Sequence, residues 1–282
     1  LLRHVSPAFA EDPVRILRLA RFAARFADFR VAPETLALMR GMVAAGEVDA
    51  LVPERVWQEI ARGLMEARPS RMIAVLRDCG ALARLLPEVD RLFGVPQPAQ
   101  HPEVDTGAHL LLVLDAAAAA GLPLAGRFAC LLHDLGKATS PAHKLPHHYG
   151  HEAASERLAA EVCARLKCPA DCRDLALMVA REHGIVHRAL ELRPLTIVRL
   201  IERCDGLRRP ERFAAMLDAC ACDHRGRAGL GDRPYPQRGH LLAALAAVRG
   251  VDAGAIARGL ADKARIPEAV HEARVAALKA LG

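Results

Sequence analysis

Aromatic residues are scarce in this sequence of 282 residues, since Phe, Trp and Tyr make up 4% of it whereas 52% of the residues are hydrophobic. The apolar content is sufficient for a sizeable core, which excludes a disordered chain. β-Branched residues rarely alternate with polar ones, while Ala, Leu and Arg dominate. This composition favours the helical period of 3.6 residues over the strand period of 2. We therefore predict an almost entirely α-helical, all-α fold.

The eight cysteines include no paired CxxC units and do not reach the density of a small secreted scaffold. Zinc ribbons and disulfide-rich secreted domains are both built on such cysteine patterns. We therefore expect reduced thiols, most of them buried.

Long apolar runs and a leader are also lacking. No run reaches the roughly 18 residues of a membrane span, and the N-terminus does not show the basic-then-apolar order of a signal peptide. We expect a cytoplasmic protein with no membrane partner. The net charge of +6, from 39 Lys and Arg against 33 acids, favours a polyanionic partner such as RNA without establishing one. The oligomeric state is left open, with a homodimer as one possibility.

Proline and glycine divide the chain into three parts. The connector 91–102 carries three prolines and a glycine, and the Gly/Pro/Arg-rich stretch 225–238 precedes two amphipathic helical patterns at 241–249 and 252–281. Because the sequence begins with Leu1 and its opening resembles the middle of a domain, we expect a truncated chain. The predicted domains are a helical neck and body at 1–95, a second helical domain at 96–225 and a C-terminal helical tail at 226–282.

Six residues of metal-ligand type recur as an H…HD…H…H…D series. Imidazole and carboxylate groups bind divalent transition metals, which turn bound water into a nucleophile near neutral pH. Adjacent His and Asp residues cannot point the same way on an ideal helix, so joint chelation requires a helix end or a local distortion. Both His109 and the His133-Asp134 pair lie at the ends of predicted helices. The series consists of His109, His133, Asp134, His151, His183 and Asp223.

A basic helical motif lies near the N-terminus. Two acids, Glu11 and Asp12, precede Pro13, which suits a helix start. At about 100° per residue the arginines share one arc and the apolar residues take the opposite one. Taken alone, this spacing is also typical of a solvated charged face. The arginines of the motif are Arg15, Arg18, Arg21 and Arg25.

The run Glu-Asp-Pro-x-Arg-x-x-Arg-x-x-Arg-Phe-Ala-Ala-Arg resembles the nucleotide-recognition motif of bacterial tRNA nucleotidyltransferases, the CCA-adding enzymes. Segment 52–59 resembles the neck helix of that family, and segments 75–82 and 86–90 resemble the region after it. The H…HD…H…H…D series then follows in the order found in the multifunctional proteobacterial branch. The resemblance covers essentially the whole chain.

The resemblance implies that Asp12 and Arg15 form Watson–Crick-like hydrogen bonds with incoming CTP or ATP, so that the protein acts as the template. The chemistry agrees, because a carboxylate accepts from an exocyclic amino group and a guanidinium donates to a ring nitrogen or carbonyl. Arg18 and Arg21 match positions that contact nucleotide, where they would bind phosphate. Glu11 would orient Arg15, or else complement the helix terminus.

The second domain resembles the HD phosphohydrolase superfamily. The resemblance implies metal-dependent hydrolysis of 2′,3′-cyclic phosphodiesters, 2′-nucleotides and simple phosphate esters. Catalysis would depend on His133, Asp134 and Lys137, whose ammonium group would bind a phosphate oxygen. The ligand types suit Ni²⁺, Mn²⁺, Co²⁺ and, less well, Mg²⁺. The implied core ligands are His109, His133, Asp134 and Asp223, with His151 and His183 available for a second metal.

Several histidines and one aspartate compete with these assignments. Asp205 is an alternative to Asp223 as the last ligand. We prefer Asp223 because segment 222–227 resembles the family's Ala-Asp-x-Arg-Gly-Arg ending, with Cys222 in place of the alanine. We interpret four other histidines as surface or supporting groups: His143, His147, His148 and His187.

Members of the family begin with a head domain in which a Gly-Gly turn and an Asp-x-Asp pair hold phosphate and Mg²⁺, and neither motif occurs before Glu11. We therefore expect that this chain alone adds no nucleotides, whereas the longer protein would extend the tRNA 3′ end by a two-metal route. One alternative is a tRNA-binding body with an inactive HD site. Another is a freestanding HD hydrolase unrelated to tRNA, against which the 11–25 motif argues.

Overall fold

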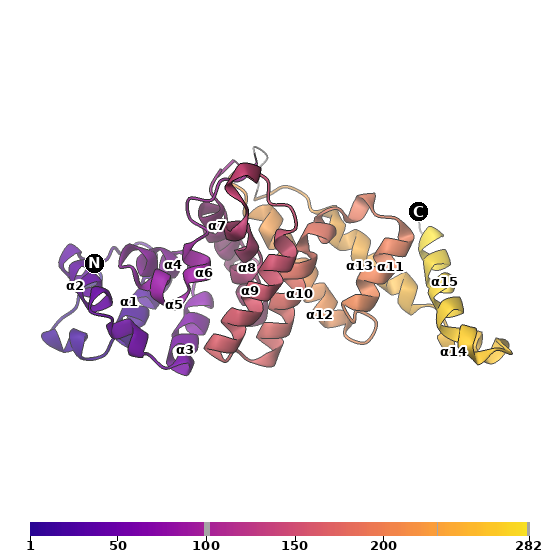
Figure 1. Cartoon of the computed structure of the whole chain (residues 1–282), viewed down its shortest axis with the longest axis horizontal. Helices are drawn as coiled ribbons and strands as arrows, with labels where there is room; N and C mark the ends of the chain where they lie inside the picture. Colours follow the sequence, from indigo (N-terminus) through magenta and orange to yellow (C-terminus); the bar gives the residue numbers. More distant parts are fainter. Residues whose placement is uncertain (99–101, 230, 281–282) are drawn as a thin grey trace. The chain divides into compact units, whose positions relative to one another are not determined.

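The computed structural model describes residues 1–98, 102–229 and 231–280 (Figure 1). Within these ranges the chain is built from α-helices and short 3-10 helices, and pairing of the strand type is confined to two isolated bridges, Leu2 with Val31 and Pro96 with Asp105. The predicted all-α fold class is confirmed.

The chain divides into two compact units, and two of the three divisions fall within helices. Unit 1 comprises Leu1–His183 and Ala219–Arg233, and unit 2 comprises Gly184–Asp218 and Pro234–Gly282. Unit 1 therefore includes residues of both the predicted body and the predicted second domain. The domain boundaries at 95 and 225 stay predictions.

Most of the helices belong to unit 1. Its elements are η1 (Pro7–Glu11), α1 (Val14–Arg25), α2 (Pro33–Ala44), η2 (Glu47–Ala50), α3 (Pro53–Leu64), α4 (Pro69–Asp78), α5 (Ala81–Leu85), α6 (Pro87–Asp90), α7 (Thr106–Ala119), α8 (Leu124–Leu132), η3 (Leu135–Thr139), η4 (Ala142–Lys144) and α9 (His151–Leu166). The helices divided between the units are α10 (Ala170–His187) and α12 (Pro210–Arg225). Unit 2 contains η5 (Ala189–Glu191), α11 (Pro194–Arg203), α13 (Pro236–Arg249), α14 (Ala253–Gly259), η6 (Lys263–Arg265) and α15 (Ile266–Lys279).

Proline marks many of the helix starts, because its fixed φ and missing N–H suit the first turn of a helix. Pro33, Pro53 and Pro69 begin α2, α3 and α4 in this way. In α1, Pro13 directly precedes the first helical residue, and Asp12 Oδ1 accepts a hydrogen bond from the backbone N–H of Val14 at 3.1 Å. The expected start of this helix after the acidic pair is confirmed.

The core of unit 1 forms where α1 packs against α3 and α4, and α3 packs against α8 and α9. The Trp57 ring meets the edge of Phe128 at a centroid distance of 5.0 Å. Arg127 is buried in α8, and its guanidinium donates to the carbonyl oxygens of Leu64 and Leu122, each at 2.8 Å. These contacts fix α8, whose C-terminal end carries two residues of the H…HD…H…H…D series.

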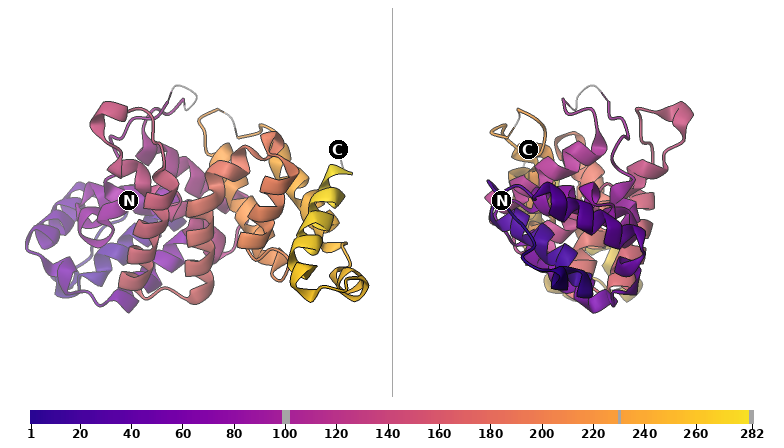
Figure 2. Two further views of the ribbon diagram at one scale, coloured as in Figure 1. Left: turned by 45° about the vertical axis from the view of Figure 1, so that its right-hand side comes forward. Right: turned by 90° about the vertical axis from the view of Figure 1, so that its left-hand side faces the viewer.

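A glycine allows η3 to approach α9 closely. A Cβ atom on Gly136 would lie 2.1 Å from the carbonyl oxygen of His151 and 2.6 Å from the backbone nitrogen of Ser155. The Gly136 N–H instead donates to Ser155 Oγ at 2.8 Å. The chain after η3 then projects from the helices of unit 1 around η4 before it returns to α9 (Figure 2).

In unit 2, α15 packs against α11 and α13, and Arg274 donates to Glu202 Oε1 at 2.8 Å. One stretch of this unit, Pro236–Gly259, is long and apolar enough to cross a membrane by length and composition, although the sequence analysis expected no such run. It includes α13, α14 and the turn between them. Core helices of soluble proteins reach the same length and apolar character.

Candidate functional site

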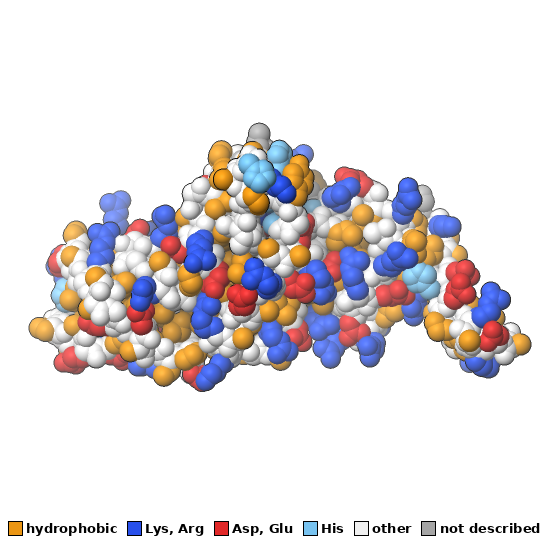
Figure 3. Space-filling view, viewed as in Figure 1, with side chains coloured by type: hydrophobic (Ala, Val, Ile, Leu, Met, Phe, Trp, Pro, Cys, Tyr) orange, Lys and Arg blue, Asp and Glu red, His pale blue; other side chains and the backbone are white. Residues whose placement is uncertain are grey.

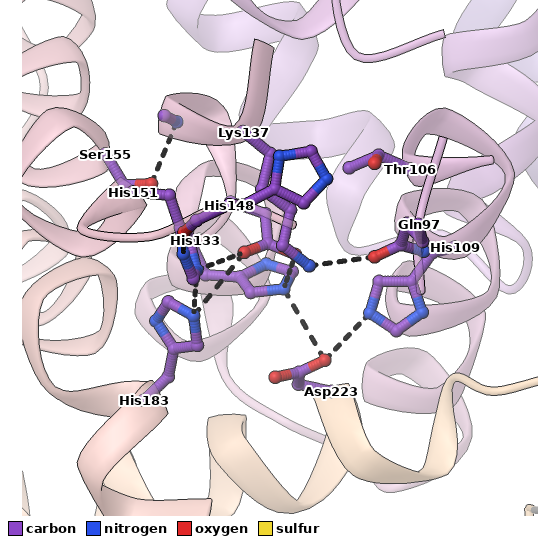
Figure 4. Close-up of polar contacts among 12 residues, drawn as sticks. Gln97, Thr106, His109, His133, Lys137, His148, His151, Ser155, His183 and Asp223 are labelled. Atoms are coloured by element: carbon purple, nitrogen blue, oxygen red, sulfur yellow. Dashed lines mark hydrogen bonds and ion pairs between the residues drawn. The ribbon is translucent and has the colours of Figure 1, made fainter. Parts of the chain in front are cut away.

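All six residues of the H…HD…H…H…D series converge in unit 1 (Figure 4). They form two groups of three, and within each group the potential ligand atoms lie within 4.8 Å of one another. One group consists of His109, His133 and Asp223, and the other of Asp134, His151 and His183.

Helix ends position most of these side chains. His109 lies in the first turn of α7, which is capped by Asp105, whose Oδ1 accepts from the N–H of Ala108 at 2.7 Å. His133 is the C-terminal cap of α8 and Asp134 precedes η3, so the helix ends between the adjacent residues. The expected helix end at this pair is confirmed. His151 is the first residue of α9.

Asp134 faces both groups with its two carboxylate oxygens. Its Oδ2 lies 3.2 Å from His133 Nε2, while its Oδ1 lies 3.3 Å from His151 Nε2 and 3.4 Å from His183 Nε2. Asp223 Oδ1 completes the other group at 2.8 Å from His109 Nε2 and 3.6 Å from His133 Nε2. The carboxylates thus lie among inward-facing imidazole nitrogens.

Each of the four histidines directs its Nδ1 to an oxygen outside its group. A carbonyl oxygen can only accept a hydrogen bond, so for the three histidines with such a partner it places a proton on Nδ1 and directs Nε2 into the cluster. Metal-ligating histidines are typically oriented in this way. The partners are Glu103 Oε1 for His109 (2.9 Å), Cys130 O for His133 (2.8 Å), His148 O for His151 (2.7 Å) and Val179 O for His183 (3.0 Å).

The charges within the cluster are strongly coupled. Burial disfavours a charged imidazole at His133, but the carboxylates of Asp134 and Asp223 outweigh it and raise the pKa of His133 to about 10. Burial likewise opposes ionisation of Asp134, but His133 and Lys137 hold the pKa of Asp134 well below its usual range. The centre therefore combines ionised carboxylates with cationic groups in a buried environment.

Two atoms at the middle of the cluster have no hydrogen-bond partner among the described residues: His133 Nε2 and Asp134 Oδ1, both fully buried. An unsatisfied buried polar atom costs free energy that a bound cation would offset. Nitrogen and carboxylate oxygen atoms at this spacing are a donor set for a divalent transition metal. The residues present therefore fit the metal that the sequence predicts.

The predicted phosphate ligand Lys137 is buried next to this centre. Its Nζ lies 2.7 Å from Asp134 Oδ2 and donates to Gln97 Oε1 at 2.8 Å. Lys137 thus compensates the charge of Asp134, and its contact with phosphate stays a prediction. Sequence reasoning missed Gln97, which lies in the proline-rich connector 91–102, and Glu103, which directly follows that connector.

Most of the residues that the sequence offered as alternatives to the six do not join the cluster. Asp205 lies in unit 2, where Arg208 Nε donates to its Oδ1 at 2.9 Å, so Asp223 is the carboxylate that joins His109 and His133. His143 and His147 are exposed. His187 Nδ1 lies 2.9 Å from the Tyr235 hydroxyl in unit 2. The exception is His148, which is buried and supports His151 through its carbonyl oxygen.

The predicted nucleotide-recognition residues lie along α1 and the turn before it. Asp12 Oδ2 accepts from Arg55 at 2.7 Å, and this hydrogen bond lowers the pKa of Asp12. Arg15 and Arg18 line a cavity of about 450 Å³ that also contacts Phe9 and Phe22. Glu11 is exposed, and no hydrogen bond joins it to Arg15 among the described contacts.

Arg21 is directed toward α3. Its Nε donates to the buried Glu59 at 2.8 Å, and Arg18 lies 3.6 Å from the same carboxylate. The side chain of Arg21 is only 15% exposed, so it holds α1 against α3. Sequence reasoning did not single out Glu59 or Arg55 as partners of this helix.

Comparison with known proteins relates both parts of the chain to one family. A family model described as the probable RNA and SrmB- binding site of polymerase A matches residues 28–93, and the HD domain model matches residues 106–215. The multifunctional CCA protein of Aromatoleum aromaticum is 70% identical over 281 residues, covering 99% of this chain and 69% of the relative. The chain belongs to the multifunctional CCA protein family. Its counterpart from Azoarcus sp. strain BH72 is also 70% identical, over 100% of this chain and 68% of that protein.

The fold resembles that of solved CCA-adding enzymes. A solved CCA-adding enzyme in complex with ATP aligns with a TM-score of 0.56 at 16% identity, covering 98% of this chain and 58% of that chain. A second, in complex with CTP, also gives a TM-score of 0.56. At this identity the likeness shows the fold alone. The family resemblance inferred from the sequence is confirmed by the curated relatives.

Proposed function

We propose that these residues form the nucleotide-recognition body and the HD domain of a CCA-adding tRNA nucleotidyltransferase, and that the HD site is a metal-dependent phosphohydrolase. Its substrates would be 2′,3′-cyclic phosphodiesters, 2′-nucleotides and simple phosphate esters. The observation that carries the hydrolase is the convergence of four histidines around buried atoms without hydrogen bonds: three direct Nδ1 to a backbone carbonyl oxygen, and Nδ1 of the fourth, His109, lies 2.9 Å from Glu103.

His109, His133 and Asp223 would hold one divalent ion, and Asp134, His151 and His183 a second. A bound ion supplies Lewis-acid activation of water and neutralises charge on the phosphoryl group. The ligand types favour Ni²⁺, Mn²⁺ or Co²⁺ over Mg²⁺.

The surrounding residues orient this centre and balance its charge. Glu103 holds His109 at Nδ1, and backbone carbonyls hold the other three imidazoles, so little reorganisation accompanies binding. Lys137 brings a positive charge to the edge of the cluster, where exchange of its Gln97 contact for a phosphate oxygen would bind the substrate dianion.

The transferase half of the proposal assigns the base edges of CTP and ATP to Asp12 and Arg15, and their phosphates to Arg18 and Arg21. The cavity beside Arg15 and Arg18 supports this assignment, as does membership of the family. Arg55 would share the Asp12 carboxylate with the incoming base. The tRNA 3′ end is the proposed acceptor, and Mg²⁺ for the transfer would bind in the head domain of the longer protein.

The hydrolase is tested with 2′-AMP and 2′,3′-cyclic AMP in the presence of Ni²⁺, Mn²⁺ or Mg²⁺. We expect phosphate release and ring opening by the wild type, and a loss of about a hundredfold or more in the His133→Ala, Asp134→Ala double variant, because both ligand groups lose a member. His240→Ala, which removes an exposed histidine of unit 2, should retain activity.

A folded, metal-loaded wild type that hydrolyses neither substrate would contradict the hydrolase. That result would favour the alternative, a tRNA-binding body with an inactive HD site.

A further inference from the structure

An exposed aromatic pair lies in the loop between η4 and α9. The rings of His147 and Tyr149 are stacked, with centroids 5.6 Å apart and an interplanar angle of 23°. Tyr149 is 79% exposed, in a sequence that contains only two tyrosines. Aromatic side chains normally bury a large apolar area in cores or at binding surfaces. Packing within the chain therefore does not account for this pair.

The residue between the two rings anchors the loop. His148 is buried, and its ring nitrogens lie 2.8 Å from Ser140 Oγ and 2.9 Å from the carbonyl oxygen of Pro96. The loop is thereby attached both to the residue that follows η3 and to the segment before α7. His147 and Tyr149, on either side of His148, then face outward. Because His148 already fixes this surface, little entropy is lost when it binds a ligand.

The loop leads directly into the candidate metal centre. His151, a proposed ligand, follows Tyr149 by two residues, so their Cα atoms are at most about 7 Å apart. The carbonyl oxygen of His148 also holds His151 Nδ1 at 2.7 Å. A phosphate bound at His151 would therefore leave the rest of its molecule within reach of the exposed rings.

The charge of this segment suits an anionic substrate. Residues 135–151 contain no Asp or Glu, whereas His143, Lys144 and His147 are exposed. Figure 3 shows histidine, lysine and hydrophobic side chains gathered over the part that projects at the top of the view. Nucleic-acid ends combine a negative backbone with flat bases, and both features match this surface.

We propose that Tyr149, supported by His147, is the base-stacking subsite of the HD site. It would favour nucleotides, including an RNA 3′ end that carries a 2′-phosphate or a cyclic phosphate, over phosphate esters without a base. Every base has a π-face, so stacking selects for the presence of a base and tolerates its identity. This inference rests on the proposed hydrolase activity.

The test compares 2′-AMP with glycerol 2-phosphate, a secondary phosphate ester that has no base. We expect Tyr149→Ala to raise KM for 2′-AMP by about tenfold, and to leave kcat and the hydrolysis of glycerol 2-phosphate within about twofold of wild type. Tyr149→Trp, which keeps a stacking surface, should retain a low KM. The matched control is Phe29→Ala, which removes another exposed aromatic side chain of unit 1, one whose ring is tilted against that of Phe26.

An unchanged KM for 2′-AMP would overturn the inference. An equal loss of activity on 2′-AMP and glycerol 2-phosphate in Tyr149→Ala, together with a reduced metal content, would also overturn it. Tyr149 would then act by supporting His151. If the wild type hydrolyses neither substrate, the proposed hydrolase activity is refuted. The stacking subsite is then tested by calorimetry, which compares 2′-AMP binding by the wild type and by Tyr149→Ala. Weaker binding by Tyr149→Ala would still support the subsite, whereas equal or absent binding would refute it.

Discussion

Glu103 is a residue outside the H…HD…H…H…D series that contacts the candidate metal centre. Its side chain is 4% exposed, and its Oε1 lies 2.9 Å from His109 Nδ1. Burial disfavours the ionised carboxylate, but the contact with His109 outweighs it and the pKa of Glu103 is lowered to about 2. Glu103 is therefore an anion that orients His109 toward Asp223.

The Glu103→Gln variant should bind metal about 10- to 100-fold more weakly than wild type, because the neutral amide loses the charge that fixes His109. Calorimetric titration with Mn²⁺ measures this change. Glu161→Gln is the control, since Glu161 is exposed and its ion pair is with Arg157 on the same helix, α9. Equal affinities for the two variants would show that Glu103 does not support the metal.

Residue types and their order were sufficient to select six residues that the fold brings together, because imidazole and carboxylate groups are metal-ligand types that a sequence shows directly. Their role as ligands stays a prediction. Glu103, Gln97 and Glu59 could not be predicted in this way. Each contacts a residue on another element, and such contacts depend on how the segments fold together. The prolines of segment 91–102 indicate a local break in helix, but they do not show that Gln97 returns to Lys137.

At the scale of elements, helix starts were readable because proline and acidic caps act locally, as at Pro13 before α1. The close approach of η3 to α9 could not be predicted from the sequence, since it depends on the absence of a side chain at Gly136. A lone glycine in a sequence is compatible with a turn, a helix end or a close contact. Only the packing of η3 against α9 distinguishes them.

The Gly136→Ala variant should lower the free energy of unfolding by about 2 kcal/mol or more, because its Cβ would meet the backbone of α9. Displacement of α9 should also weaken metal binding through His151. Urea unfolding and metal titration measure the two effects. Gly41→Ala in α2 provides the control, because nothing lies within 4 Å of a Cβ there and helix propensity favours alanine. Similar behaviour of the two variants would contradict the close approach.

For the whole molecule, metal should act as a folding ligand, because both ligand groups form only in the folded chain. A metal concentration a hundred times the dissociation constant stabilises a protein by about 2.7 kcal/mol, which should raise Tm by on the order of 5 °C. Scanning calorimetry with Mn²⁺, and again after chelation with EDTA, measures this shift. The His133→Ala, Asp134→Ala variant should show none, and an equal shift in both proteins would place the metal elsewhere.

The position of Asp134 between the two ligand groups makes them a single thermodynamic system. One of its oxygens faces His133 and the other faces His151 and His183, so an ion in one group alters the charge and orientation that the other group presents. Such an influence is reciprocal by linkage. The binding isotherm should therefore require two coupled constants, and the half-loaded protein is a distinct chemical species.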